Sequence, residues 1–312
     1  MASREESVVV ASAGTQAAHP HAALESQPSI RPTPASRAVW RWAREIARYA
    51  ILVVASLAGI FPVLWMVTVA MKDQAEYANE RVGLPDALSL SNFSSVLSDP
   101  QFLKYVLNSV IVVGVAVPVL TITSVMAGYA LARLWGRAGI PILFVFLTSE
   151  LIPLPIVAIP LLLTVKHLGI EDGTVRLIFV YSVLMMGFAV LLARAFFRSI
   201  PEELREAARL DGCGELQIFW RIMVPLARSP ITLIAVLSFI LLWNEVFLAV
   251  VLLDSVNDRT LPLGLAEFQG KYSSDWPKMA AALILSTLPT IALFAAFQGR
   301  ITSQFSRSTV RE

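Results

Sequence analysis

Charged residues are scarce in this chain. Asp, Glu, Lys and Arg make up only 15% of its 312 residues, whereas hydrophobic residues make up 56%. A soluble globular protein carries about 25% charged residues, so this composition excludes a pair of ordinary soluble domains, which would need a polar surface. The 25 basic residues nearly balance the 23 acidic residues, and this balance gives no sign of a nucleic-acid partner.

Cysteine and histidine are scarce as well. The single cysteine, Cys213, excludes an intrachain disulfide framework and a metal cluster built on cysteines. The three histidines, His19, His21 and His167, form no ligand cluster and cannot readily supply the base of an intramembrane hydrolase. The phosphate-binding loop G-x-x-x-x-G-K-[ST] is missing too, since residues 264–272 have the wrong glycine spacing and a Tyr after the Lys. We therefore expect that this chain is not an enzyme and binds no metal ion or nucleotide itself.

Long apolar stretches are what the chain has instead. Crossing the roughly 30 Å hydrocarbon core takes about 20 apolar residues as a helix, because backbone amides find no water there. Six stretches meet this requirement: residues 49–71, 105–132, 140–165, 177–193, 230–253 and 279–299. Pro153, Pro155 and Pro160 predict a kink or a break in the third stretch. The sequence therefore predicts an all-α polytopic membrane protein with six transmembrane helices.

The basic residues predict the orientation of these helices. Cytoplasmic loops are enriched in Lys and Arg. If the N-terminus is inside, 17 of the 25 basic residues fall on inner segments and 8 on outer ones. We therefore expect both termini in the cytoplasm.

The composition also predicts the division of the chain. Residues 1–36 are rich in Ala, Ser and Pro, so we expect a disordered cytoplasmic tail that continues as a basic juxtamembrane segment to residue 45. We expect residues 46–300 to form a six-helix transmembrane domain and residues 301–312 to form a second cytoplasmic tail. The first apolar stretch lies too late and is too long for a cleaved signal peptide, so it stays as an anchor. The first outer loop, residues 72–104, should be a small folded cap of short helices.

The loop of residues 198–229 is the least membrane-like part of the domain. Ser199 followed by Glu202 is a capping-box pattern, and Pro201 suits the first turn of a helix. Gly212 offers the left-handed residue that ends such a helix. The spacing places Leu204, Ala207 and Ala208 on one narrow apolar face, while Arg205, Glu206 and Arg209 face elsewhere.

A second short helix should follow from about Glu215. Its apolar stripe would consist of Leu216, Phe219, Trp220 and Met223, and Pro225 should stop it. Two short helices joined at a glycine make a compact lever at the membrane surface. On periodicity alone, an amphipathic connector lying among the lipid headgroups is an equally good interpretation.

One string in this loop resembles a known motif: Glu206-Ala207-Ala208, three residues, Gly212, nine residues, then Ile222 and Pro225. The string is similar to the EAA loop of permease subunits of binding-protein-dependent ABC importers. The family usually has Leu before the final proline, where this chain has Val224.

Further strings resemble the carbohydrate-uptake branch of that family, and the second permease of maltose-type systems most of all. They are Glu206 to Gly212, Asn108-Ser109, Tyr129 to Arg133 and Trp243-Asn244-Glu245. The resemblance covers roughly residues 45–300. The end of the chain departs from it, because residues 301–308 replace the usual glycine-rich basic stretch, so contacts made by that tail in relatives are not carried over.

The resemblance implies a type I ABC importer permease fold in which the loop docks into a groove on a cytoplasmic ATP-binding subunit. Closure of an ATPase dimer would then push the crossings through this contact. Glu206 would anchor the docked helix by a charged hydrogen bond, and Gly212 would let the loop turn back to the membrane. The residues assigned to this coupling are Glu203, Glu206, Ala207, Ala208, Asp211, Gly212, Ile222 and Pro225.

The implied assembly lies in the cytoplasmic membrane of a bacterium. It would contain a second permease subunit, two ATP-binding subunits that hold ATP and Mg, and an extracellular solute-binding protein. The implied cargo is a sugar or oligosaccharide, moved by alternating access. The sequence does not name the sugar, because specificity in such systems rests largely on the binding protein and on the shape of the cavity.

Two acids lie inside the apolar stretches, Glu150 in the third and Glu245 in the fifth. Charges at this depth are costly and usually face a cavity or the interior of the helix bundle. A sugar path needs aromatic faces and hydrogen-bonding groups, which Trp243, Asn244 and the two acids supply. The same residues can instead fix helix packing, and for Trp243-Asn244-Glu245 a structural or gating role is slightly favoured.

Three alternatives stay open. An importer of polyamines or another small solute is the nearest, although the string Leu210-Asp211-Gly212 argues against it. An ion-coupled secondary transporter could use Glu150 or Glu245 as a proton site, but it would need inverted repeats, and the halves show no duplication. A membrane-embedded enzyme is the least favoured.

Overall fold

The computed structural model describes residues 34–271 and 275–308, and within these residues the chain is helical with no strand. The chain divides into two units, residues 1–58 and 59–312. Helix α1 (Pro34–Met71) begins in the first unit and ends in the second. Of the tail predicted for residues 1–36, residues 1–33 lie outside the described part of the chain. Pro34–Ser36 are already helical, which corrects the predicted boundary.

Four helical segments are long and apolar enough to cross a membrane, and two bent helix pairs raise the number to as many as six. The four are Trp42–Met71, Pro100–Arg133, Gly173–Ser199 and Trp276–Gly299. The bent pairs are Gly136–Ser149 with Leu154–His167, at 109°, and Glu215–Leu226 with Arg228–Trp243, at 76°. The first pair lies over the predicted third stretch, which is therefore a broken helix, whereas the bend of the second pair lies at Ala227, before the predicted fifth stretch.

The remaining bounds follow the chain. The helices after α1 are α2 (Gln74–Asn79), α3 (Ser91–Leu97), α4 (Pro100–Arg133), α5 (Gly139–Ser149), α6 (Leu154–His167), α7 (Gly173–Leu184), α8 (Met186–Ser199), α9 (Glu203–Leu210), α10 (Glu215–Ile218), α11 (Val224–Leu226), α12 (Arg228–Trp243), α13 (Phe247–Leu252), α14 (Leu261–Lys271) and α15 (Trp276–Ser308). Short turns η1 (Gly136–Ala138) and η3 (Val256–Asp258) are 3₁₀ helices, and η2 (Phe219–Met223) is a π-helical turn. Residues 301–308 of the predicted second tail belong to α15.

Three of the predicted crossings are interrupted midway. Pro153 and Pro155 lie at the break between α5 and α6, as predicted, whereas Pro160 stays inside α6. The break between α7 and α8 lies at Met185, and the break between α12 and α13 follows Trp243. The sequence analysis predicted neither of these two breaks, because no proline marks them.

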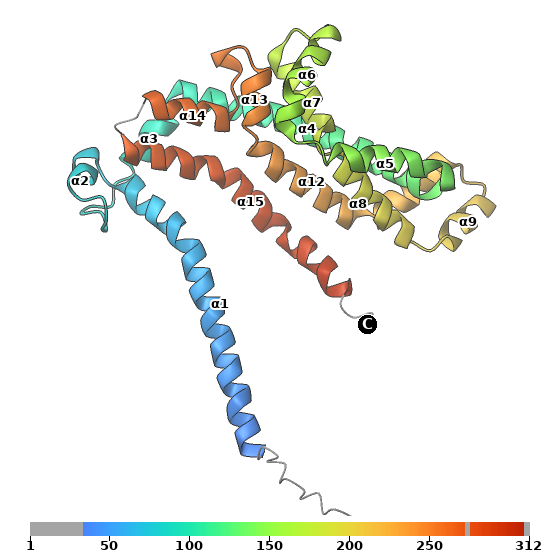
Figure 1. Cartoon of the computed structure of the whole chain (residues 1–312), viewed down its shortest axis with the longest axis horizontal. Helices are drawn as coiled ribbons and strands as arrows, with labels where there is room; N and C mark the ends of the chain where they lie inside the picture. The colour runs from blue at the N-terminus through green and yellow to red at the C-terminus, as the bar shows by residue number, and fades with distance from the viewer. Residues whose placement is uncertain (1–33, 272–274, 309–312) are drawn as a thin grey trace, which may run out of the picture. The chain divides into compact units, whose positions relative to one another are not determined.

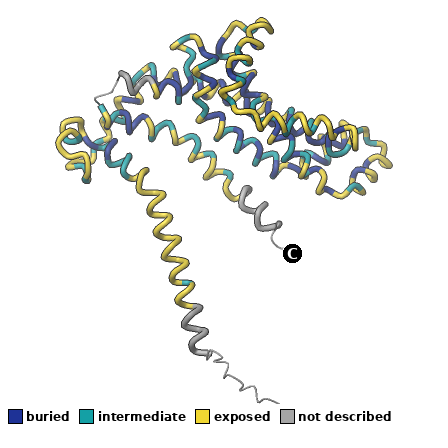
Figure 2. The backbone as a smooth tube through the Cα atoms, viewed as in Figure 1, coloured by how far each residue is buried: buried dark blue, intermediate teal, exposed yellow. Residues whose placement is uncertain are grey.

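Helix α4 is the long unbroken helix at the centre of the second unit. It packs against α7, α8, α12 and α14, and Figure 1 shows it passing behind the other helices. Gly128 allows the close approach to α8, since a methyl group there would lie 2.6 Å from the Cβ of Ala193. The packed helices bury two separate clusters of side chains along α4. Buried residues are the dark blue parts of the backbone tube in Figure 2.

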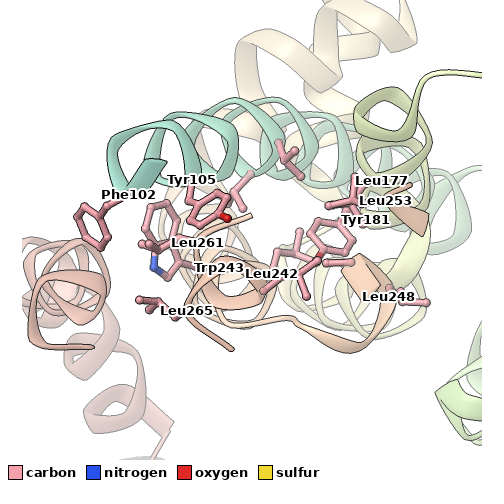
Figure 3. Packing of buried hydrophobic residues seen from close by; sticks show 14 of the residues in the cluster. Phe102, Tyr105, Leu177, Tyr181, Leu242, Trp243, Leu248, Leu253, Leu261 and Leu265 are labelled. Carbon is pink, nitrogen blue, oxygen red and sulfur yellow. The ribbon is translucent and has the colours of Figure 1, made fainter. Parts of the chain in front are cut away.

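The two clusters lie toward opposite ends of α4. The cap-side core includes Phe102 and Tyr105 of α4 with Tyr181, Trp243 and Leu261 (Figure 3). The largest members of the hairpin-side core are Tyr129, Phe197, Ile218, Phe219 and Met223. The first core takes its name from the outer-loop cap of residues 72–104. This cap is folded, as predicted.

Helices α2 and α3 form this cap and are tied to the end of α1. The buried Nζ of Lys72 donates to the carbonyl oxygen of Glu80 at 2.8 Å. The amide nitrogen of Asn92 donates to the carbonyl oxygens of Ala70 and Lys72 at 2.9 and 2.8 Å. These bonds satisfy backbone carbonyls at the end of a helix, which otherwise lack partners.

Candidate functional site

The hairpin between the fourth and fifth predicted crossings consists of α9, a glycine turn and α10. Gly212 adopts φ 81°, and its N–H donates to the carbonyl oxygen of Arg209. The N–H of Cys213 donates to the carbonyl oxygen of Ala208. This pair of bonds is a Schellman motif, and it confirms the predicted end of the first hairpin helix.

The predicted start of that helix is wrong. Ser199 ends α8, and its hydroxyl donates back to the carbonyl oxygen of Phe196 at 2.7 Å. Helix α9 begins at Glu203, and the Glu202 side chain makes no capping bond. The capping box does not form because the carboxylate of Glu202 binds arginines instead.

The predicted faces of α9 are also wrong. Arg205 and Ala208 are buried, with 6% and 5% of their surface exposed, whereas Leu204 is 45% exposed and Ala207 is exposed as well. An analysis of apolar spacing places an arginine outside by default. Here the guanidinium faces inward because it meets two carboxylates.

The second hairpin helix begins at Glu215, as predicted, but its buried stripe differs. Ile218, Phe219 and Met223 are buried, while Leu216 and Trp220 are 67% and 48% exposed. The π turn η2 shifts the stripe, because it adds one residue per turn. Pro225 does not stop the helix, which continues to Leu226.

Glu215 is the centre of a polar cluster, and it accepts five hydrogen bonds from three side chains. Oε2 accepts the Tyr129 hydroxyl at 3.0 Å and Nε of Arg205 at 3.3 Å. Oε1 accepts Nη2 of Arg205 and Nε of Arg209, both at 2.9 Å. Tyr129 is 86 residues from Glu215 in sequence, so this carboxylate joins the hairpin to α4.

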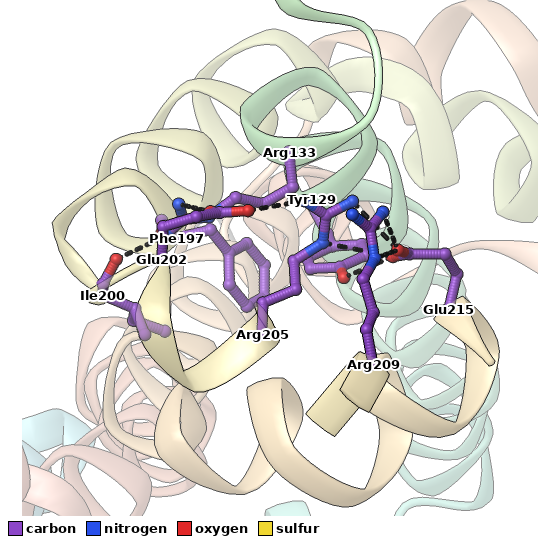
Figure 4. Close-up of polar contacts among 8 residues, drawn as sticks. All are labelled: Tyr129, Arg133, Phe197, Ile200, Glu202, Arg205, Arg209 and Glu215. Carbon is purple, nitrogen blue, oxygen red and sulfur yellow. Dashed lines mark hydrogen bonds and ion pairs between the residues drawn. The ribbon is translucent and has the colours of Figure 1, made fainter. Parts of the chain in front are cut away.

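Glu202 forms the second half of the cluster. Its Oε1 accepts Nη1 of Arg205 at 2.6 Å, and its Oε2 pairs with Nη1 of Arg133 in α4. Nη2 of Arg133 also donates to the carbonyl oxygens of Phe197 and Ile200 at the end of α8. The contacts run from Tyr129 through Glu215, Arg205 and Glu202 to Arg133, and α4, which carries both ends, closes them into what we call the hairpin ring (Figure 4).

Aromatic rings pack beside the hairpin ring. The ring of Tyr129 lies edge-on to Phe197, with centroids 5.4 Å apart, and 5.0 Å from Phe219. Phe197 and Phe219 lie 6.4 Å apart. This packing excludes water from one side of the polar cluster, which strengthens its hydrogen bonds.

Burial opposes the charge of Arg205, but its hydrogen bonds with Glu202 and Glu215 outweigh that effect and raise the pKa of the guanidinium. The group therefore stays charged at every ordinary pH. A buried cation held by two carboxylates keeps its position and its charge, so Arg205 has a structural role that does not change with pH.

The predicted coupling residues lie mostly on the side of the hairpin that faces away from the ring. Glu203, Glu206, Ala207 and Asp211 are exposed along α9, and the exposed Gly212 follows them. Ala208 is buried, Ile222 is half-buried in η2, and Pro225 is exposed in α11. The structure therefore brings five of the eight together on one open surface.

Glu150 and Glu245 line one cavity of about 490 Å³. The cavity lies where three broken helices are interrupted, since its lining includes Glu150 between α5 and α6, Met185 between α7 and α8, and Glu245 between α12 and α13. Most of the remaining lining is apolar. Interrupted helices expose backbone groups at membrane depth only where a cavity or packed protein meets them.

Both acids cap the start of a helix. Oε1 of Glu150 accepts the N–H of Phe188 in α8 at 2.9 Å. Glu245 accepts the N–H groups of Leu248 and Ala249 in α13 at 2.8 and 3.3 Å, and the Tyr181 hydroxyl at 2.6 Å. The positive end of each helix dipole favours such a carboxylate. Glu245 therefore links α7 to the start of α13 through its bonds.

Trp243 and Asn244 line a different cavity, of about 340 Å³, together with Ser286 and Thr287 of α15. The indole N–H of Trp243 donates to the carbonyl oxygen of Ser286 at 3.0 Å, and its ring stacks on Phe239. The side-chain amide of Asn244 donates to the carbonyl oxygen of Ile240 at 2.7 Å. The four residues predicted for a substrate path are thus divided between two cavities.

The sequence analysis missed Arg205, Glu215, Arg133 and Tyr181 as site residues. Tyr129 and Arg133 are spaced i, i+4 on α4, and Glu202 and Arg205 are spaced i, i+3, so these two spacings are the local signals for the ring. Among the described residues, no group of three His, Cys, Asp or Glu side chains is placed to hold a metal ion.

Comparison with known proteins yields one family. The family model for the binding-protein-dependent transport system inner membrane component matches residues 89–307. A diacetylchitobiose uptake system permease protein of Streptomyces coelicolor is 30% identical over 84% of this chain and 88% of its own length. A sulfoquinovosyl glycerol transport system permease protein of Agrobacterium fabrum is 31% identical over 78% of this chain and 86% of its own length.

A solved structure agrees with these relatives. A chain of a bacterial ABC transporter involved in the import of the acidic polysaccharide alginate matches with a TM-score of 0.73 and 25% identity. The match covers 86% of this chain and 98% of that chain.

Proposed function

The chain belongs to the family of binding-protein-dependent transport system inner membrane components, and from this premise we propose that it is the permease subunit of an ATP-driven importer for a sugar or oligosaccharide. Relatives named for diacetylchitobiose and sulfoquinovosyl glycerol, and a structural relative named for alginate, support this class of cargo. Family membership leaves the ion-coupled secondary transporter and the membrane-embedded enzyme without support.

The topology that fits this function has six crossings, the upper number for this chain, with α5 and α6 as the third and α12 in the fifth. Six crossings place both termini on the same side, and the basic residues favour the cytoplasm for that side. The membrane is the cytoplasmic membrane of a bacterium. The partners are a second permease, two ATP-binding subunits that hold ATP and Mg, and an extracellular solute-binding protein.

The observation that carries the proposal is the hairpin's open surface. One side of α9 is exposed and acidic, because it carries Glu203, Glu206 and Asp211. The hairpin ring holds the other side to α4. A surface of this kind suits a cytoplasmic partner that binds α9 and moves it. Glu206 anchors the docked helix, and the exposed Ala207 lets the partner approach closely.

The cavity at the three helix breaks is the better candidate for the cargo path. Glu150 uses one oxygen to cap α8, and its second oxygen accepts no hydrogen bond within the described residues. That oxygen can accept a sugar hydroxyl. The pair of acids in one cavity also keeps a polyamine importer as the second candidate, since a polyamine would bring cationic groups to both carboxylates.

Crosslinking tests the coupling. A crosslinker on Ala207→Cys, in a Cys213→Ser background, should join this chain to a nucleotide-hydrolysing subunit in native membranes. Leu88→Cys in the cap, 81% exposed, is the matched control and should not crosslink to that subunit. Gly212→Pro should leave membrane insertion intact and abolish substrate-stimulated ATP hydrolysis, because proline cannot adopt the positive φ of this turn. Crosslinks that never reach such a subunit, or normal stimulation in the Gly212→Pro complex, would contradict the proposal.

Uptake tests the cargo. The complex, reconstituted in vesicles with its binding protein, is offered labelled diacetylchitobiose, maltotriose, an alginate oligosaccharide and spermidine. We expect uptake of at least one saccharide and none of spermidine. Uptake of spermidine alone would replace the sugar importer with the polyamine importer.

A further inference from the structure

The hairpin ring has a geometry that fixes the orientation of α9. Its two ends, Tyr129 and Arg133, lie one turn apart on α4, and its middle member, Arg205, lies on α9. A tilt of α9 against α4 would have to break the bonds to Glu202, to Glu215, or to both. Charge-assisted hydrogen bonds of this kind are about twice as strong as neutral ones, so the ring resists such a tilt (Figure 4).

The covalent chain does not supply the same connection. Residues 200–202 join α9 to α8, and residues 211–214 join it to α10, so neither link reaches α4. The second hairpin helix then passes through the π turn η2, a form that marks local irregularity in a helix. The side chains of the ring, together with the apolar packing beside them, are therefore what joins the hairpin to α4.

Helix α4 connects the hairpin to the far side of the domain. It stays one helix over 34 residues, whereas the third, fourth and fifth predicted crossings are each interrupted. At its other end, Lys104 Nζ donates to Oδ1 of Asn257 at 2.9 Å, and Asn108 donates to the carbonyl oxygen of Asn257 at 2.8 Å. The hydroxyl of Ser109 accepts the N–H of Leu261 at 2.7 Å. Helix α4 thus runs from the hairpin to the loop at residues 253–260.

We propose that the hairpin ring makes α9 and α4 one rigid body, with Arg205 as the positioning residue that sets how much motion passes from a cytoplasmic partner to the 253–260 loop. The ring lies on the side of α9 opposite Glu203 and Glu206, so a partner can bind α9 without disturbing it. Loss of Arg205 lets α9 tilt on its own. The inference rests on the proposed function, because it assumes a partner that moves α9.

The first experiment measures substrate uptake and ATP hydrolysis in the same vesicles, using the saccharide that the wild-type complex takes up. Arg205→Met keeps the length and packing of the side chain and removes its five donors. We expect the uptake per ATP hydrolysed to fall by about fivefold or more, the size of an ordinary coupling between sites, while the partner still hydrolyses ATP. Arg221→Met is the matched control, since Arg221 is an exposed arginine of the same hairpin, and its ratio should not change.

The second experiment measures rigidity directly and needs no cargo. Spin labels on Leu210→Cys in α9 and Leu134→Cys at the end of α4, in a Cys213→Ser background, report the distance between the two helices in the assembled complex. The distance distribution should be narrow with Arg205 and broad with Arg205→Met. If the Arg205→Met complex does not assemble, Tyr129→Phe takes its place. This change removes one hydroxyl and keeps the packing of the aromatic ring, so the distance distribution should have an intermediate width.

An unchanged uptake ratio, or an unchanged distance distribution, in the assembled Arg205→Met complex would overturn the inference. Equal loss of uptake and ATP hydrolysis would also overturn it, because Arg205 would then be needed for docking itself. Failure of the proposed function looks different: the wild-type complex would show no saccharide-stimulated ATP hydrolysis, and the distance measurement would still decide whether the ring is rigid.

Discussion

Acidic side chains serve two regions of this molecule in different ways. In the hairpin ring, Glu202 pairs with Arg133 and Glu215 accepts the hydroxyl of Tyr129, both from α4, and each carboxylate also binds Arg205 of α9. At the helix breaks, Glu150 and Glu245 bind backbone N–H groups at the start of α8 and α13. The first arrangement joins elements to one another, whereas the second completes helices that have been interrupted.

The difference follows from the surroundings. The ring lies beside residues exposed to solvent, and its two carboxylates are 39% and 35% exposed. Full charges cost little free energy there, and the ion pairs fix the orientation of the side chains. Glu245 lies in an apolar bundle where a cation would be costly to bury. Helix N-termini offer partial positive charge without a charged side chain. The same residue type, glutamate, therefore stiffens the ring and completes the interrupted helices at the breaks.

Removing the cap at Glu245 should have the largest effect. Glu245→Ala leaves the Tyr181 hydroxyl and the N–H groups of Leu248 and Ala249 without their acceptor. Each buried group left unsatisfied costs about 1–3 kcal/mol, so we expect a loss of about 3 kcal/mol in the free energy of unfolding. Thermal unfolding in detergent measures it, and hydrogen exchange should accelerate at those two amides.

Glu245→Gln keeps one acceptor oxygen and should lose less than half as much stability. The matched control is Glu171→Gln, an exposed acid before α7, which should have no effect. Equal losses in Glu245→Ala and Glu171→Gln would contradict the distinction drawn between capping acids and solvated ones.

A methyl group at Gly187 tests how tightly the other break is built. It would lie 2.5 Å from the carbonyl oxygen of Phe146 and 2.6 Å from Oε1 of Glu150. We expect Gly187→Ala to cost about 2 kcal/mol, since overpacking of this kind costs about 1–3 kcal/mol, and to weaken the bond from Glu150 to Phe188. Unfolding of the purified protein measures the loss.

The control for that change is Gly114→Ala in α4, where a methyl group meets nothing within 4 Å. Alanine favours a helix over glycine by about 1 kcal/mol, so this variant should be as stable as the parent or slightly more so. A stable Gly187→Ala protein would show that the break can relax, and the two regions would then differ less than their contacts suggest.

Tyr129→Phe sharpens the hairpin side of the comparison. The change removes one hydrogen bond to Glu215 and leaves the aromatic packing with Phe197 and Phe219 in place. We expect a loss of about 1 kcal/mol. In a double-mutant cycle with Glu215→Gln, the two losses should not add, because the residues share one bond. Additive losses would mean that the Tyr129 hydroxyl is not part of the ring.

The fold was predictable where composition alone decides it. Uninterrupted apolar stretches correspond to long helices α1, α4 and α15, and Pro153 and Pro155 correspond to a real break. The breaks at Met185 and after Trp243 were not predictable in the same way. The break at Met185 depends on Glu150, which lies 38 residues from the amide that it accepts, and such a contact is not visible in a local pattern. At the break after Trp243 the cap is local, since Glu245 accepts amides three and four residues later, but no proline accompanies it.

The candidate site divides along the same line. Gly212 announced its turn because only a residue that tolerates positive φ fits there. Arg205 was assigned to the wrong face, because spacing rules count apolar residues and treat every arginine as solvated. Its inward position depends on Glu202, three residues earlier, and also on Glu215 and the aromatic side chains of α4 and α8, which have no fixed spacing from α9.

The smallest effect concerns an acid that combines features of both regions. Asp254, in the loop after α13, pairs with Arg176 of α7 but is 63% exposed, whereas the arginine is 1% exposed. The hydrogen bond from Arg176 lowers the pKa of Asp254, and the nearby charge of Lys166 adds to that shift. A lowered folded-state pKa means that the pair stabilises the protein above the ordinary carboxyl pKa of about 4 and that this stability is lost as the pH falls below it.

Because the carboxylate is exposed, water screens the pair, and we expect a contribution below about 1 kcal/mol. Unfolding of the parent protein and of Asp254→Asn, measured between pH 6 and pH 3 and at low salt, should give stabilities that differ at pH 6 and approach each other toward pH 3. An exposed carboxylate that behaved like Glu245, with a large loss independent of pH, would place Asp254 among the acids that complete helices. A small loss that vanishes in acid and in salt would place it with the paired acids of the ring, since only charge attraction to a guanidinium responds to both conditions.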